Sequence, residues 1–196
     1  MRLRVIKELS KREQFAVDAK QQALDYWNSQ PIIDKVRIAR TKELIGKHIP
    51  PYGRVIDIGA GSRPFDCDVA LDVAAEVLKG CQEALLPYLD SADGTFFCAI
   101  CTDVLAELPQ FVHRLALSEL SRILQPGGYL VCSTQLDQKT YDAKECFEKL
   151  ICTEFDLIAE RVSYAPLFFS ETIGRIIRGD GGASHVILIA KKRALH

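Results

Sequence analysis

The stretch VIDIGAGS, residues 55–62, decides the fold. Its three β-branched residues, Val55, Ile56 and Ile58, form a short strand pattern that runs directly into a loop with two glycines. Similar short apolar runs follow at 69–73, 96–100 and 129–132, with a helical pattern at 111–124 before the last of them. Strands of this kind that alternate with amphipathic helices are typical of a mostly parallel sheet covered on both faces. The sequence therefore predicts an α/β fold.

The segments on either side complete this layout. Two further strands are expected at 155–163 and 185–191, and the irregular stretch between them, with a short helix near 170–177, favours an antiparallel edge strand. The first fifty residues have helical spacing, and Ser10 with Glu13 matches a capping box that predicts a helix start. A second helix is expected to end near Ile45, before Gly46. We therefore expect a helical extension or lid at 1–50 and the α/β domain at 51–196.

The charge and cysteine content narrow the function classes. The 196 residues include 25 Lys and Arg against 26 Asp and Glu, a net charge of −1, which makes nucleic acid an improbable obligate partner. Seven cysteines, an odd number, predict reduced thiols and a cytoplasmic protein. Cys98 and Cys101 are three apart on a strand and should face opposite sides as buried thiols. We expect neither a metal site nor insertion into a membrane, and the oligomeric state is not indicated.

The glycine loop is the expected ligand site. In open α/β sheets a ligand lies beyond the carboxyl ends of the strands. Gly59 and Gly61 lack a Cβ, so a ligand can lie against their main chain. Asp57 precedes the loop, and Asp72 ends the next strand, where its carboxylate can accept hydrogen bonds from both hydroxyls of a ribose. This combination predicts a nucleoside-binding site.

Three segments resemble class I S-adenosylmethionine-dependent methyltransferases, and most closely their small-molecule branch, often labelled type 11. They are VIDIGAGS, ALDV at 70–73 and SELSRILQPGGYLVCS at 118–133. In that family an Arg, two apolar residues and a Pro-Gly-Gly lead from a helix into the fifth strand, as residues 122–129 do here. The resemblance covers about 54–133. It implies a Rossmann-like methyltransferase fold, S-adenosyl-L-methionine as cofactor, and methyl transfer to an O, N or C atom of a small molecule.

The resemblance also implies residue roles. The glycine loop would pass under the methionine part of the cofactor, with Asp57 ordering the loop or the amino group. Asp72 would hold the ribose, and residues of the next segments would lie near the adenine or line the cofactor from the fourth strand. The cofactor-binding residues implied in this way are Asp57, Gly59, Ala60, Gly61, Ser62, Asp72, Val73, Gln82 and Cys101.

A catalytic base is required only if the methyl acceptor carries a proton at working pH. Asp103, just past the fourth strand, is the candidate, with His113 second; a helix cap is the structural alternative for Asp103. Tyr26 and Trp27 on the expected lid are either aromatic residues that face the substrate or anchors in the core.

Several departures from the family pattern suggest a shortened member. Arg63 and Pro64 replace the third glycine of the loop, and Cys81 and Gln82 stand where an aspartate usually lies near the adenine. Only ten residues, 59–68, separate the first two strands, fewer than a parallel crossover normally needs. The spacing at 75–85 predicts a helix in place of the third strand. An alternative therefore stays open: a non-catalytic binding or interaction module that keeps the fold with an eroded cofactor site.

Overall fold

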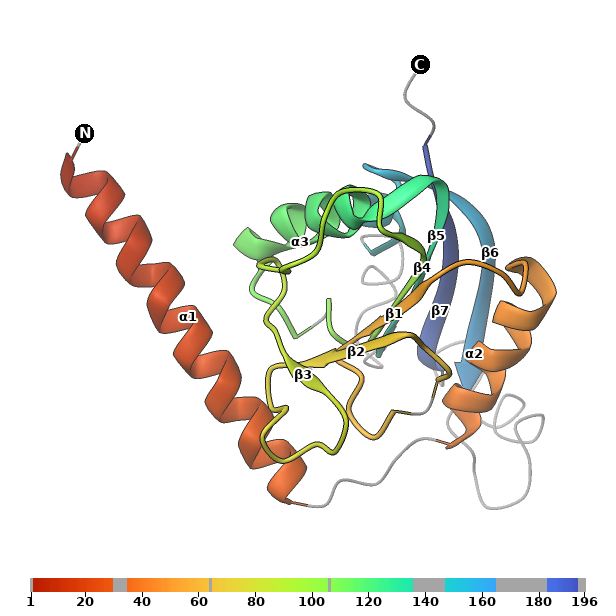
Figure 1. Cartoon of the computed structure of the whole chain (residues 1–196), viewed down its shortest axis with the longest axis horizontal. Helices are drawn as coiled ribbons and strands as arrows, with labels where there is room; N and C mark the ends of the chain where they lie inside the picture. Colours follow the sequence, from red (N-terminus) through yellow and green to blue (C-terminus); the bar gives the residue numbers. More distant parts are fainter. Residues whose placement is uncertain are drawn as a thin grey trace.

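A computed structural model of the chain describes residues 2–29, 35–63, 65–105, 107–135, 147–164 and 183–193. Its centre is a seven-stranded sheet with the order β3-β2-β1-β4-β5-β7-β6 (Figure 1). The strands are β1 (Val55–Ile58), β2 (Val69–Asp72), β3 (Gln82–Glu83), β4 (Phe96–Thr102), β5 (Leu124–Gln135), β6 (Phe155–Tyr164) and β7 (Ala183–Lys192). The labelled helices are α1 (Arg2–Asn28), α2 (Lys35–His48) and α3 (Gln110–Ile123), and residues 147–151 are also helical.

The strand directions confirm a mostly parallel sheet with an antiparallel edge pair. Neighbouring strands from β3 to β5 run parallel, whereas β7 is antiparallel to both β5 and β6. Because β7 runs in the opposite direction, it begins at the sheet edge where β4 and β5 end. His185, near the start of β7, pairs with Gln135 at the end of β5. This topology brings the last part of the chain to the edge where a ligand is expected.

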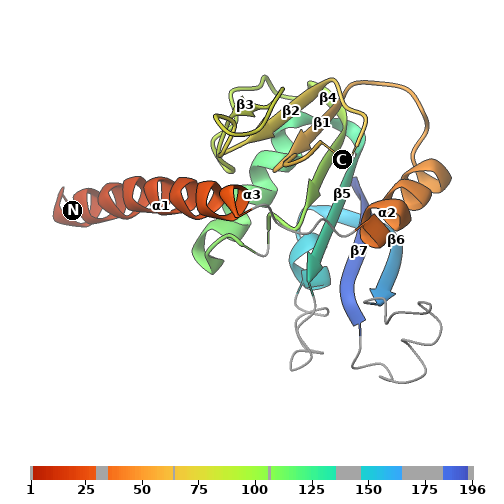
Figure 2. The same cartoon turned by 90° about the horizontal axis from the view of Figure 1, so that it is seen from below.

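The two faces of the sheet are covered by different helices. Figure 2 shows α2 and α3 on opposite sides of the central strands. On α3, residues Val112, Ala116, Leu120 and Ile123 are buried, a spacing of three or four that places one helix face against the sheet. On the other side, Leu44 of α2 belongs to a cluster with residues of β4, β5 and β7. Both faces of the central strands are therefore core.

The alternation along β4 explains its two cysteines. Cys101 belongs to the core cluster on the α3 side, and Cys98 to the cluster on the α2 side. Both thiols are free and buried, and burial raises the pKa of Cys98 to about 12 and that of Cys101 well above its ordinary value. The expectation that these cysteines face opposite sides as buried thiols is confirmed. Cys146 lies outside the described residues.

The Pro-Gly-Gly segment forms an irregularity at the start of β5. Phe96 pairs with Leu124, yet Cys98 already pairs with Tyr129, so five residues of β5 oppose two of β4. A Cβ at Gly128 would lie 2.9 Å from the Gln125 carbonyl oxygen and 3.0 Å from that of Phe97, and Gly127 has a φ of +73°. Glycine is needed here because two backbones approach closely.

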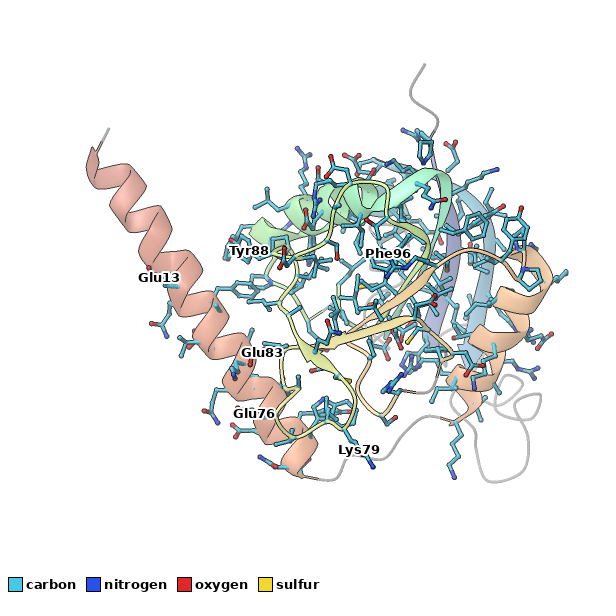
Figure 3. The ribbon with its side chains drawn as sticks, viewed as in Figure 1. Glu13, Glu76, Lys79, Glu83, Tyr88 and Phe96 are labelled. Atoms are coloured by element: carbon cyan, nitrogen blue, oxygen red, sulfur yellow. The ribbon has the colours of Figure 1, made fainter. Side chains whose placement is uncertain are left out.

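Helix α1 begins earlier than the capping signal predicts. It starts at Arg2 rather than near Ser10, since the preceding residues are themselves good helix formers and extend the helix. In Figure 2 its N-terminal part projects away from the sheet. Its later turns are held by an ion pair between Lys20 and Glu83 at 2.8 Å, and Glu76 lies 3.7 Å from the same ammonium. Figure 3 shows both glutamates beside α1.

The segment between β2 and β3 corrects a second expectation. The predicted helix at 75–85 is wrong: residues 73–80 form turns, and the third strand is present at Gln82–Glu83. Leu71 pairs with Gln82 and Asp72 with Glu83, in parallel. A two-residue strand needs only two ladder positions, so a chain of nine residues in tight turns can reach it. The shortened first connection is confirmed, because the described residues of 59–68 form turns instead of a helix.

Helix α2 also differs at its end. It continues through Gly46 to His48, and a Cβ at Gly46 would meet nothing within 4 Å. Its expected start near Pro31, the departure at Pro64, and the predicted helix and loop at 170–182 lie outside the described residues. Among the described helices none is both long and apolar enough to cross a membrane.

Candidate functional site

The loop after β1 is a turn of bare main chain held against β2. Gly59 and Gly61 have φ values of +69° and +49°, and the amides of Gly59 and Ala60 both donate to the Leu71 carbonyl, at 2.8 and 2.9 Å. A Cβ at Gly59 would lie 2.2 Å from Val104 Cγ2, and one at Gly61 would lie 2.3 Å from Trp27 Cζ2. Side chains from two other segments therefore touch the loop where it lacks its own.

Asp72 faces this loop and fixes its shape. Its Oδ2 accepts a hydrogen bond from the Gly61 amide at 3.0 Å, and its Oδ1 accepts one from the Ala74 amide at 2.9 Å. The side chain lies at the end of β2 and the residue is 5% exposed. Each carboxylate oxygen has a second lone-pair direction. Asp72 can thus order the loop and still accept a hydrogen bond from a ligand hydroxyl.

Asp57 places a second carboxyl group beneath the same loop. It is 1% exposed, and its Oδ2 has no hydrogen-bond partner among the described residues. Burial, and after it the nearby charge of Asp72, raise the pKa of Asp57 to about 7, against the opposing effect of Arg63 and Arg37. A buried carboxyl without a hydrogen-bond partner favours a cationic or hydrogen-bond-donating ligand group.

Arg63 lies on the β3 side of the loop. Its own backbone has a φ of +55°, and its Nη1 would be 2.5 Å from a Cβ at Gly80. The Cys81 thiol donates to the Gly61 carbonyl at 3.8 Å, so this side chain also lies beside the loop. The guanidinium therefore passes over the segment that the resemblance assigns to the adenine, and it brings a positive charge there.

The remaining cofactor-binding candidates are spread around this loop. Ser62 and Gln82 are exposed, Ala60 is buried, and Val73 is half-buried next to Asp72. Cys101 is 0% exposed and faces the α3 core, so only its main chain could meet a ligand. Within the described residues, no group of three or more His, Cys, Asp or Glu side chains could hold a metal ion.

The aromatic pair at the end of α1 covers the loop. Trp27 is half-buried with its indole on Gly61, whereas Tyr26 is 52% exposed and packs edge-on against Trp27 at 5.1 Å between ring centroids. The structure therefore separates the two residues that were considered together. Trp27 touches the candidate site, and Tyr26 mainly faces solvent.

Asp103 lies on the other side of the loop, in a cluster of polar side chains from four elements. Its Oδ1 accepts a hydrogen bond from Ser133 Oγ at 2.7 Å, and its amide donates to the Ser133 carbonyl at 3.1 Å. Its Oδ2 lies 3.1 Å from Arg37 Nε and 3.7 Å from His185 Nε2. The backbone of Asp103 has a φ of +60°, a strained conformation for a residue other than glycine.

Two members of this cluster were missed by the sequence reasoning. Arg37 comes from α2 and His185 from β7, far from Asp103 along the chain. The position of His185 near one end of a predicted strand was a possible signal, but it required the strand direction. His113, the second candidate base, instead places its Nε2 2.8 Å from the Leu108 carbonyl near the start of α3.

No protein-family model matches the chain, and no curated protein does. Among solved structures it is similar to the PH0226 protein of Pyrococcus horikoshii (TM-score 0.59, 15% identity, 81% of this chain and 91% of that chain). It is also similar to a SAM-dependent methyltransferase of Thermotoga maritima (0.55, 16%, 97% of each chain). A third is the N-methyltransferase NodS of Bradyrhizobium japonicum in complex with S-adenosyl-L-homocysteine (0.56, 15%, 81% and 86%).

These likenesses define the class of fold. The chain has the Rossmann-like sheet found in SAM-dependent methyltransferases, with its glycine loop, Asp72 and Asp103 at the carboxyl edge of the strands. The same fold can host unrelated chemistry. The activity must therefore be argued from the site.

Proposed function

We propose that this protein is an S-adenosylmethionine-dependent methyltransferase that acts on an O, N or C nucleophile of a small molecule. The observation that carries the proposal is the convergence of two buried carboxyl groups, Asp57 and Asp72, beneath a loop of bare main chain. S-adenosylmethionine when bound supplies an electrophilic methyl group on a positively charged sulfonium. A site lined by carboxylates and glycine backbone suits such a cationic adenosyl compound.

The loop argues against a phosphate-containing ligand such as a dinucleotide. Phosphate sites at glycine loops depend on the amides and positive dipole of a following helix N-terminus. Here the described residues between β1 and β2 form turns, and the Gly61 amide already donates to Asp72. Two neighbouring carboxyl groups would also repel phosphate oxygens. The site therefore favours a ligand without a pyrophosphate.

The chain's residues divide the work of binding and orientation. Asp72 would accept ribose hydroxyls while it holds the loop, and Asp57 would meet the amino group of the methionine part. Trp27 would cover the loop and exclude water, consistent with a lid role for the helical extension. Holding an acceptor in line with the methyl group can lower the barrier by about 7–11 kcal/mol through orientation alone.

Labelled methyl transfer tests this proposal. The protein is incubated with S-adenosylmethionine that carries a radioactive methyl group and with the small-molecule fraction of a cell extract. We expect label in a small organic product, and loss of that label when Asp72 is replaced by Ala. Tight cofactor binding with no labelled product from any fraction would instead support a non-catalytic binding module.

A further inference from the structure

The cluster around Asp103 is assembled by the antiparallel strand. Asp103 follows β4, Ser133 is on β5, Arg37 is on α2, and His185 is near the start of β7. Because β7 runs against its neighbours, His185 reaches the edge where β4 and β5 end. Four distant parts of the sequence therefore place polar side chains at one point beside the glycine loop.

This cluster lies next to the place where the methyl group would be. Val104 directly follows Asp103, and it fills the space that a Cβ of Gly59 would take, at 2.2 Å. The loop that carries Asp103 is therefore in van der Waals contact with the loop that would carry the cofactor. Asp72 lies on the β2 side of that loop, and Asp103 lies on its β4 side.

Asp103 is placed to orient other groups. Ser133 Oγ donates to one carboxylate oxygen, and the guanidinium of Arg37 lies against the other. The Asp103 side chain is 33% exposed, whereas those of Arg37 and His185 are 13% and 12% exposed. A carboxylate beside an imidazole orients the ring and stabilises its protonated form. His185 Nε2 faces Asp103 Oδ2 at 3.7 Å, which leaves Nδ1 as the ring nitrogen remote from the carboxylate.

We propose that His185 is the proton acceptor of the reaction and Asp103 its positioning residue, so that the methyl acceptor belongs to the class whose nucleophilic atom carries a proton, an amine or a phenol. This inference rests on the proposed function. The acceptor atom forms a bond to the methyl carbon with its own electron pair, and the carbon–sulfur pair returns to sulfur. The proton of the acceptor atom moves to His185 Nδ1, and the resulting imidazolium is balanced by Asp103.

The first test separates binding from chemistry with the full chain. S-adenosylhomocysteine binding is measured by calorimetry, and methyl transfer from S-adenosylmethionine is measured with two sets of acceptors. One set carries a proton on the nucleophile (primary amines and phenols), and the other does not (pyridines and thioethers). We expect transfer to a member of the first set, a fall of about 100-fold or more for His185→Ala, and partial recovery with added imidazole. Homocysteine-product affinity should change less than about twofold.

The control is His48→Asn on the same helix as Arg37. His48 is eleven residues further along α2, about 16 Å away at 1.5 Å per residue. This variant should keep the wild-type rate. The inference is overturned if His185→Ala keeps the rate as well, if only proton-free acceptors are methylated, or if the protein binds S-adenosylhomocysteine and methylates neither set. Failure of the wild type to bind S-adenosylhomocysteine would refute the proposed function itself.

A second readout needs no acceptor. The ring resonances of His185, assigned by their loss in His185→Asn, are followed by NMR over pH with S-adenosylhomocysteine present. Asp103→Asn removes the carboxylate but leaves Arg37 nearby, so the midpoint of the His185 titration should fall by about one pH unit. An unchanged midpoint would contradict the pairing of Asp103 with His185.

Discussion

The indole of Trp27 lies on the main chain of Gly61, so close that a Cβ added to the glycine would be 2.3 Å from Cζ2. The last turn of α1 therefore closes over the loop proposed to carry the cofactor. Because Trp27 is the single tryptophan of the chain, its emission reports on this contact alone.

Cofactor binding should change the fluorescence of Trp27. We expect a saturable change in emission during titration with S-adenosylhomocysteine, because the ligand would displace water or the indole itself from the loop. Trp27→Phe should still bind in calorimetry but give no signal. Heat of binding in the wild type without any change in emission would mean that the ligand lies elsewhere.

Gly61→Ala should destabilise the protein by about 1–3 kcal/mol, since it combines a positive φ with the contact to Trp27. Urea unfolding measures this change. In a Trp27→Ala background part of the loss should be recovered, because the steric component is gone. The matched control is Gly46→Ala in α2, where an added Cβ meets nothing within 4 Å and should stabilise the helix. Equal effects at the two glycines would contradict this packing.

Asp57 should make stability fall as the pH rises from about 4 to about 7. Its pKa is raised from 3.8 to about 7 in the folded state. In this window the unfolded chain has lost the proton that the native carboxyl keeps, so deprotonation favours unfolding. One pH unit corresponds to about 1.4 kcal/mol, which gives an upper bound of about 4 kcal/mol. Above about pH 7 this contribution is constant.

Asp57→Asn should remove this decline, and urea unfolding at pH 5 and pH 8 measures it. Asp66→Asn, an exposed site in the same connection, is the control and should keep the wild-type dependence. If Asp57→Asn and the wild type show the same loss between these pH values, the buried carboxyl is not the source.

Arg63→Ala should favour S-adenosylmethionine over S-adenosylhomocysteine. The guanidinium lies beside the loop, and it repels the sulfonium charge that only the first compound carries. At this distance and partial exposure the effect is about 2–5-fold in the ratio of the two dissociation constants. Arg114→Ala, exposed on α3, should leave the ratio unchanged. A ratio that moves in the opposite direction would show that Arg63 assists binding.

The fold could largely be predicted because its signals are local. The β-branched runs placed β1, β2, β4, β6 and β7 within one or two residues of their observed bounds, and the apolar spacing at 111–124 placed α3. The two-residue strand β3 was missed because so short a strand has no periodicity of its own. Apolar residues at 75, 78 and 81 lie in turns, where their helical spacing has no structural meaning.

The site could be predicted only where it depends on strand ends. Gly61 and Asp72 follow from the rule that ligands bind at the carboxyl edge, and the structure brings them into hydrogen-bond contact. Arg37 and His185 could not be placed, because their approach to Asp103 depends on the packing of α2 and on the direction of β7. Neither is written in the local sequence.

The central claim is that the loop at 59–62, faced by Asp72, binds an adenosyl sulfonium compound. Calorimetric titration of the full chain with S-adenosylmethionine and with S-adenosylhomocysteine tests it most directly. The account predicts saturable binding of one ligand per chain, lost in Asp72→Ala protein that is still folded at the temperature of the titration. No heat from either compound at millimolar concentration would contradict it.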